Sequence, residues 1–333
     1  MKIGFVIGPA VSGDANGVKS QGRTWAEGLR ALGHEVELVH SWGHYDWKSF
    51  DLIHVLGFGT WLDLVPAIIA RSPAAIVLSP ILDSTRHPWL QRCASRCAIA
   101  PLHMTSPLAS LRAVDRHVMR YYARSEHERR YLVRALGIGS DRVCIVPLSC
   151  RFSHFAIEEP RQPFCLHVSI LSSRNKNVLR LAHAAIRHGF RLVLAGSPGE
   201  ERFRRELEEL VREHPNIELH GFVDDAQLVR LYRTARVFAL PSLFEGVGLV
   251  ALEAAAHGAD VVLTRVGAPK EYYDGMAVLV DPRDTDAIGA AVMQVLAGRS
   301  FQPALSAHVR RNFSRERIAR LLESTYEELL ACA

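Results

Sequence analysis

The sequence predicts an α/β protein of two doubly wound domains, each with a parallel sheet covered by helices. Three observations support this prediction. The chain of 333 residues is too long for one ordinary core and suits two domains of about 150 residues. Short apolar, β-branched segments alternate with segments of helical periodicity, which is typical of parallel sheets. The alternation stops at a proline-containing stretch, residues 147–163, and restarts near residue 164.

The first half begins with a strand, a loop and a helix. Residues 2–7 form an apolar run typical of a buried parallel strand, and residues 8–17 are rich in Gly, Pro, Ser, Asp and Asn, as in a loop. Apolar residues then recur at helical spacing until Gly33, which ends the helix. Further strands are expected at residues 35–39, 51–56, 75–78 and 143–146.

The second half repeats the alternation. Asp224 and Asp225 open one of its helices, so we expect an amino-terminal cap there rather than a metal pair. Ligand sites of such folds lie at the carboxyl ends of the strands, so we expect a cleft between the two domains. The expected strands are 164–171, 191–195, 217–219, 237–240, 261–263 and 277–280. The expected helices are 177–188, 203–213, 225–235, about 248–257 and 315–330.

The net charge is +5, and the excess of basic residues lies in the first half. Residues 1–150 contain 17 Lys and Arg against 12 Asp and Glu, and the remainder has 23 of each. Two interpretations stay open for the arginine-rich part: a solvated helical face, or attraction to an anionic surface such as acidic lipid headgroups. No aromatic stacking pattern accompanies the arginines, which argues against nucleic acid. They are Arg112, Arg116, Arg120, Arg124, Arg129, Arg130, Arg134 and Arg142.

Composition and missing motifs narrow the class of protein. Hydrophobic residues make up 48% and charged residues 23%, and no apolar run reaches the roughly 20 residues that span a bilayer. The chain enters patterned sequence at once, which indicates a first strand rather than a signal peptide. Six cysteines without a regular framework fit a reducing compartment. Dinucleotide-binding, nucleophile-elbow and Walker motifs are absent, which disfavours dehydrogenases, hydrolases and kinases.

The most informative segment is residues 241–258, where a strand ends and a glycine-bearing turn leads into a helix. Glycines let the backbone approach a ligand closely, and the free N–H groups of a helix start favour an anion such as a diphosphate. Glu245 precedes the turn, where it can accept hydrogen bonds from sugar hydroxyls. Glu253 lies within the helix, where it can accept both hydroxyls of a ribose. The alternative is a structural turn followed by a surface glutamate. The turn consists of Gly246, Val247, Gly248 and Leu249.

This segment resembles the signature of two glutamates separated by seven residues in retaining glycosyltransferases of the GT-B fold, specifically glycosyltransferase family 4 (glycosyl transferases group 1). Other blocks resemble the family in order, at residues 16–18, 29–36, 51–55, 125–128, 194–200, 221–223 and 228–235. The resemblance implies two Rossmann-like domains that face each other across a cleft. An acceptor-binding domain is expected at residues 1–153, a nucleotide-sugar donor-binding domain at 154–310, and a helix that crosses back to the first domain at 311–333.

The resemblance also assigns donor-binding residues. In this family an arginine and a lysine of the first donor-domain loop bind the diphosphate, and Lys176 falls where the lysine falls. The arginine normally follows the strand in a Gly-Arg pair, but Ser169 and Ile170 stand there, so Arg174 is the candidate that supplies this charge. The remaining donor-side candidates are Asn16, Gly17 and Val223.

Catalysis is the point at which this sequence departs from the family. The family often has a histidine after the fourth strand of the first domain, and no histidine stands at the matching place. Asp83 is the candidate replacement, with His87 and His103 as weaker candidates. The resemblance implies front-face attack, in which the departing phosphate oxygen takes the acceptor proton. Glu245 and its neighbours would then position the reactants and stabilise the leaving group, with no cofactor and no metal.

The expected reaction moves a hexosyl group of mannose or glucose type from a GDP-, UDP- or ADP-linked sugar to a glycan or lipid-linked acceptor, with retention at the anomeric carbon. The expected role is bacterial cell-surface polysaccharide synthesis in the cytoplasm, with the basic first domain in peripheral contact with an anionic membrane. Two alternatives remain: a nucleotide-sugar epimerase on the same fold, and a catalytically weak nucleotide-sugar-binding protein.

Overall fold

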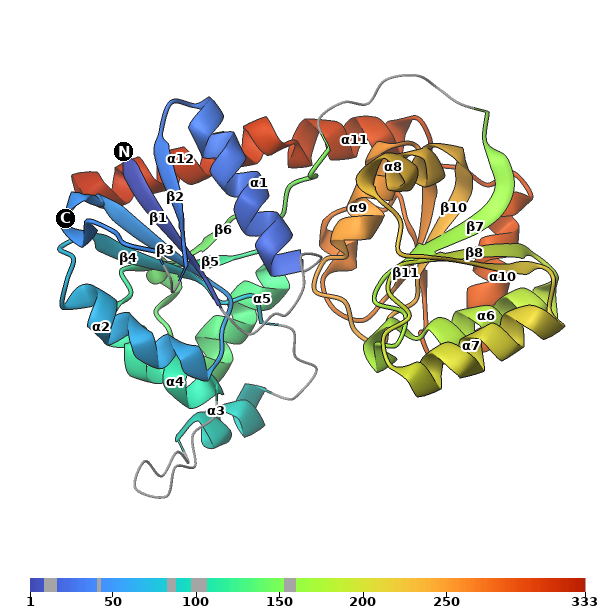
Figure 1. The fold of residues 1–333 in the computed structure, drawn as a ribbon, viewed down its shortest axis with the longest axis horizontal. Coiled ribbons are helices and arrows are strands. Elements are labelled where there is room, and N and C mark those ends of the chain that lie inside the picture. The colour runs from blue at the N-terminus through green and yellow to red at the C-terminus, as the bar shows by residue number, and fades with distance from the viewer. Residues whose placement is uncertain (9–16, 41–42, 83–87, 97–106, 153–159, 333) are drawn as a thin grey trace. The chain divides into compact units, whose positions relative to one another are not determined.

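The computed structural model describes residues 1–8, 17–40, 43–82, 88–96, 107–152 and 160–332 (Figure 1). The chain divides into two compact units. The first unit comprises Met1–Arg151 and Phe313–Ala333, and the second comprises Phe152–Asn312. Each unit contains its own parallel sheet with helices on both faces, which confirms the predicted α/β fold class.

The sheet of the first unit has the strand order β2-β1-β3-β4-β5-β6, and neighbouring strands are parallel. Ile3 of β1 is paired with Val36 of β2 and with Leu52 of β3, so β1 lies inside the sheet. The strands are β1 (Lys2–Ile7), β2 (Glu35–Val39), β3 (Leu52–Leu56), β4 (Ala75–Ser79), β5 (Arg120–Ala123) and β6 (Val143–Ile145).

Both faces of this sheet are buried, because alternate residues of each strand enter two separate cores. Along β3, Leu52 and Leu56 pack on the face that carries α1 and α12, whereas Ile53 and Val55 pack on the face that carries α2, α4 and α5 (Figure 1). The helices are α1 (Gly17–Ala31), α2 (Val65–Ile69), α3 (Pro88–Arg96), α4 (Pro107–Val114), α5 (Glu126–Tyr131) and α12 (Arg315–Ala331).

The last helix of the chain, α12, packs against α1 and the sheet of the first unit. Gly28 of α1 permits this approach, because a Cβ at that position would lie 2.7 Å from the Cβ of Ala319. Beneath it, the buried His54 ring has its Nδ1 2.5 Å from the Tyr326 hydroxyl and its Nε2 2.8 Å from Ser79 Oγ. Burial lowers the pKa of His54 to about 3, so this histidine is neutral at pH 7.

The sheet of the second unit has the order β12-β11-β10-β7-β8-β9, again parallel throughout. The chain runs outward from β7 through β8 to β9, and then returns to place β10 on the other side of β7. The strand order therefore reverses between β7 and β10. The strands are β7 (Gln162–Val168), β8 (Arg191–Ala195), β9 (Ile217–Gly221), β10 (Ala235–Leu240), β11 (Asp260–Thr264) and β12 (Val278–Val280).

Helices α6, α7 and α10 cover one face of this sheet, and α8 and α9 cover the other (Figure 1). The predicted cap of α8 is confirmed, because the Asp224 carboxylate accepts from the Gln227 N–H at 2.7 Å and the Gln227 side chain accepts from the Asp224 N–H at 3.1 Å. The helices are α6 (Val178–His188), α7 (Glu201–Glu213), α8 (Asp225–Thr234), α9 (Leu249–Ala256), α10 (Thr285–Leu296) and α11 (Ala304–Phe313).

Candidate functional site

The candidate site lies at the carboxyl end of the second sheet, where the strand order reverses. Helix α6 follows β7 on one face of the sheet and α9 follows β10 on the other, so the loops 169–177 and 241–248 diverge at this point (Figure 1). In open α/β sheets, ligands bind in the crevice outside the carboxyl ends of two such strands. These two loops contain Arg174, Lys176 and Glu245, three of the residues that the sequence singles out.

An ion pair joins the two loops. Lys176 Nζ lies 2.9 Å from Glu245 Oε2, with side-chain exposures of 25% and 11%. The same carboxylate oxygen accepts a hydrogen bond from Ser242 Oγ at 2.9 Å, and Ser242 is fully buried. The structure therefore brings Lys176 and Glu245 together, and Ser242 holds the carboxylate in place. Sequence reasoning did not identify Ser242, whose signal was only its position three residues before Glu245.

The backbone of Glu245 is fixed as firmly as its side chain. Its N–H donates to Val266 O at 3.1 Å and its carbonyl accepts from the Ala268 N–H at 3.2 Å, which ties the turn to the loop after β11. Gly267 has a φ of +107°, and a Cβ there would lie 2.0 Å from Glu245 O, so only glycine fits. Gly246, Val247 and Gly248 are buried, and Leu249 begins α9.

Glu253 lies in the middle of α9 with none of its surface exposed. The Tyr232 hydroxyl donates to Glu253 Oε2 at 3.2 Å. The alternative interpretation, in which Glu253 is a glutamate on the helix surface, is therefore wrong. Because its carboxylate is covered, a ribose can reach Glu253 only if neighbouring side chains move.

A buried histidine, His167, lies in β7 directly before the loop 169–177. Its Nδ1 is 2.8 Å from Ala239 O and its Nε2 is 2.7 Å from Ser169 Oγ. A carbonyl only accepts, so Nδ1 carries the proton, and Nε2 accepts from the Ser169 hydroxyl. Burial lowers the pKa of His167 to about 4, opposed by the Ala239 hydrogen bond and assisted by the charge of Lys176. His167 is thus neutral at pH 7, and positive charge at this edge of the sheet comes from Lys176 and the exposed Arg174.

Two of the remaining donor-side candidates lie elsewhere in the described residues, just after the end of β9 and at the start of α1. Val223 follows β9, two strands away from β7, and its neighbour Phe222 is 74% exposed. Gly17 is the exposed first residue of α1 in the first unit. Asn16 and Asp83, together with the weaker candidates His87 and His103, lie outside the residues that the structure describes.

The arginine-rich stretch does not form one solvated helical face. It passes through α4, β5 and α5, and Arg124 is buried in an ion pair with Glu128 at 2.9 Å. Three more arginines pair with carboxylates of the first unit: Arg120 with Glu328, Arg129 with Glu126, and Arg142 with Asp115. The others, Arg112, Arg116, Arg130 and Arg134, are exposed.

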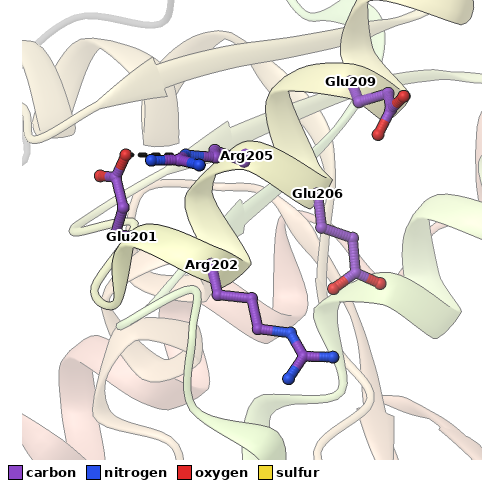
Figure 2. A pocket seen from close by; sticks show the side chains of 5 residues that line it. All are labelled: Glu201, Arg202, Arg205, Glu206 and Glu209. Carbon is purple, nitrogen blue, oxygen red and sulfur yellow. Dashed lines mark hydrogen bonds and ion pairs between the residues drawn. The ribbon is translucent and has the colours of Figure 1, made fainter.

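A separate solvent-open hollow lies along α7 in the second unit. Figure 2 shows its five lining side chains, with Glu201 paired to Arg205 at 2.9 Å; the others are Arg202, Glu206 and Glu209. Since these side chains all belong to one helix and have mixed charge, we assign no chemistry to this hollow. No helix within the described residues is long and apolar enough to span a membrane. Those residues also contain no group of three or more His, Cys, Asp or Glu that could hold a metal ion.

Comparison with known proteins finds similarity mainly in the second unit. Residues 162–298 match the family model described as glycosyl transferases group 1. The chain is 29% identical over 206 residues to the O-antigen chain mannosyltransferase B of Escherichia coli, covering 55% of this chain and 53% of that one. It is 39% identical over 112 residues to the D-inositol 3-phosphate glycosyltransferase of Corynebacterium jeikeium, covering 31% and 26%. The chain thus spans about half or less of the length of these relatives.

Solved structures resemble the whole chain and establish its fold as GT-B. The sucrose-phosphate synthase of Thermosynechococcus elongatus has a TM-score of 0.76 at 19% identity, and all of both chains is covered. Anabaena Alr3699/HepE, solved in complex with UDP, has a TM-score of 0.71 at 16% identity, with 98% of this chain and 100% of that one covered. At these identities the likeness concerns the fold alone.

Proposed function

We propose that this protein is a retaining glycosyltransferase of family 4 that transfers a hexosyl group from a nucleotide-diphosphate sugar to a glycan or lipid-linked acceptor. The Lys176–Glu245 pair carries this proposal, because it combines a cation for a diphosphate with a carboxylate for sugar hydroxyls at the switch point of the sheet. The match of residues 162–298 to glycosyl transferases group 1 supports it.

Each group of the site has a proposed role. Lys176 and Arg174 neutralise the diphosphate together with the amino-terminal end of α9, which follows Gly248. Glu245 accepts hydrogen bonds from the hydroxyls of the sugar, and Glu253 accepts those of the ribose. The backbone at Val223 contacts the base, and Asn16 and Gly17 remain donor-binding candidates.

The proposed chemistry needs no base from the protein. The bond between the anomeric carbon and the leaving phosphate oxygen breaks, the acceptor oxygen bonds to the same face of that carbon, and the acceptor proton moves to the phosphate oxygen. The protein contributes orientation and stabilisation of the charge on the departing diphosphate. We propose that Lys176 and Arg174 stabilise this charge without a metal, and that Asp83 takes the role of the family's histidine.

The relatives support the proposed donor and acceptor classes. An O-antigen chain mannosyltransferase among them favours a hexose of mannose type and an acceptor from cell-surface polysaccharide synthesis. The first unit binds this acceptor and the second unit binds the donor. We place the protein in the cytoplasm, where the exposed Arg112, Arg116, Arg130 and Arg134 contact the anionic inner face of the membrane. Sedimentation with and without phosphatidylglycerol vesicles tests that contact.

A thermal-shift screen with GDP, UDP and ADP sugars tests the donor, followed by turnover on a panel of glycan and lipid-linked acceptors with NMR of the anomeric product. We expect one nucleotide to stabilise the protein and the product to keep the anomeric configuration of the donor. Incubation with donor alone distinguishes an epimerase, which converts the sugar without an acceptor. Nucleotide binding without turnover on any acceptor would indicate a binding protein, and stabilisation by no nucleotide would refute the proposal.

A further inference from the structure

Lys176 is flanked in sequence by two asparagines whose side chains bond to other loops. The Asn175 amide pairs with both backbone polar groups of one residue, because its Nδ2 donates to Phe244 O at 2.8 Å and its Oδ1 accepts from the Phe244 N–H at 3.2 Å. The carbonyl of Asn175 also accepts from the Leu243 N–H at 2.8 Å. Three hydrogen bonds therefore connect Asn175 to the residues that directly precede Glu245.

Asn177 makes the same kind of connection on the other side of Lys176. It has a φ of +58°, a left-handed conformation that asparagine tolerates better than most residues. In that conformation its Nδ2 donates to Pro241 O at 3.0 Å and to Pro282 O at 2.6 Å. These carbonyls follow β10 and β12, so one side chain links the loop after β7 to two further loops.

We propose that Asn175 and Asn177 are positioning residues that set the placement of the Lys176 ammonium relative to Glu245. This inference rests on the proposed function, in which these two groups hold the donor. The 3-10 turn Arg174–Lys176 is only three residues long, and the asparagine side chains bond it to the loop after β10. Misplacement of a reacting group by about 1 Å can lower a rate by roughly 100-fold, so fixed spacing between the two loops matters for transfer.

The position of Asn177 allows a clean substitution. Asn177→Gly keeps the left-handed backbone and removes both side-chain hydrogen bonds. Asn216 provides a matched control, because its Nδ2 also donates to two carbonyls, Ala185 O at 3.1 Å and Phe190 O at 2.9 Å. Asn216 directly precedes β9 and thus lies at the amino end of the same sheet, away from the crevice. Asn216→Ala therefore removes two comparable side-chain hydrogen bonds at a place that does not contact the Lys176 loop.

The test measures melting temperature, the Kd for the nucleoside diphosphate that binds the wild type, and kcat/KM. We expect both variants to lower the melting temperature, but only Asn177→Gly to lower kcat/KM, by at least about tenfold. In a Lys176→Ala background, Asn177→Gly should cause no further loss of nucleotide affinity, because its effect acts through Lys176.

Two outcomes would overturn the inference while leaving the proposed function intact. One is a kcat/KM of Asn177→Gly within twofold of that of Asn216→Ala. The other is full additivity of the losses in nucleotide affinity caused by Lys176→Ala and Asn177→Gly, which would indicate a general structural role. A wild type that binds none of GDP, UDP and ADP would instead overturn the proposed function, and this inference with it.

Discussion

Glu253 offers the sharpest test of how the donor is held, because its complete burial favours a purely structural role, whereas the proposed ribose contact requires neighbouring side chains to move. We predict that Glu253→Gln weakens nucleoside diphosphate binding about tenfold. A hydrogen bond to a charged acceptor is worth about 1.5–3 kcal/mol against about 0.5–1.5 kcal/mol for a neutral one. The midpoints of these ranges differ by about 1.2 kcal/mol, which corresponds to roughly a tenfold change in Kd.

Three substitutions separate a ribose contact of Glu253 from a purely structural role. Glu253→Gln keeps the volume of the side chain and an oxygen that can accept from the Tyr232 hydroxyl. Glu253→Ala also removes that acceptor, so it should additionally lower the free energy of unfolding by about 1–3 kcal/mol. Tyr232→Phe removes the donor and leaves the carboxylate, so it should change nucleotide affinity far less than Glu253→Gln.

Isothermal titration calorimetry measures the Kd of each variant for the nucleoside diphosphate that binds the wild type. Thermal unfolding measures the stability of each variant. Glu245→Ala serves as the comparison, because we expect it to slow transfer more than it weakens nucleotide binding. Wild-type affinity in Glu253→Gln, with reduced stability in Glu253→Ala, would refute the ribose assignment and leave Glu253 a structural residue of α9.

Two further predictions concern stability. The pKa values of the buried His54 and His167 are lowered to about 3 and about 4, whereas an unfolded histidine titrates near 6.5, so the unfolded state binds more protons between these values. Each histidine should therefore lower the free energy of unfolding by about 1.4 kcal/mol per pH unit as the pH falls from about 6.5 toward 4. Urea unfolding at pH 7, 6 and 5 checks this, and an unchanged pH slope in His54→Gln or His167→Gln would contradict it. Gly267→Ala should lower the free energy of unfolding and the nucleotide affinity, because its Cβ would lie 2.0 Å from Glu245 O. Gly275→Ala is the control, since its φ is +76° but its Cβ would meet no atom within 4 Å, and it should cost only the backbone strain of about 1–3 kcal/mol; equal losses in both variants would argue against the clash.

The sequence allowed the central strands of both sheets to be predicted because buried parallel strands are continuous apolar runs. Residues 2–7 and 191–195 were predicted with the bounds that β1 and β8 have in the structure. Strand β5 (Arg120–Ala123) was missed, since it lies in the arginine-rich stretch. Its tyrosines are buried, while Arg120 pairs with Glu328 of α12, more than 200 residues along the chain. Such a partner leaves no local signal.

The contrast between local patterns and distant partners also applies to the cap of α5 and to the candidate site. Ser125 accepts from the Glu128 N–H at 3.1 Å, as a capping box requires, but the Glu128 carboxylate accepts from the Leu82 N–H and the Arg124 N–H. The bond from the Glu128 N–H to Ser125 depends on local sequence, whereas the Leu82 N–H that donates to the Glu128 carboxylate lies 46 residues earlier in the chain. Glu245 could be found from the glycine-bearing turn that it precedes, and Lys176 from the resemblance of its loop to the family.

The supporting residues of the site could not be predicted. The partners of Asn175 and Asn177 lie 64 to 105 residues away in sequence. Their roles depend on which strands become neighbours in the sheet, and hydrophobic periodicity does not determine that order. From the sequence alone, the asparagines beside Lys176 could equally be ordinary polar loop residues without a positioning role.

The central claim is that the carboxyl edge of the second sheet holds a nucleoside diphosphate through Lys176. Calorimetric titration of wild type, Lys176→Ala and Lys48→Ala with GDP, UDP and ADP tests it most directly. Lys48→Ala removes the same charge from an exposed position in the first unit. We predict that one diphosphate binds the wild type and Lys48→Ala equally, and binds Lys176→Ala roughly 10- to 100-fold more weakly, as expected for a lost charge-assisted contact. Equal binding to wild type and Lys176→Ala, or no binding to the wild type, would contradict the account.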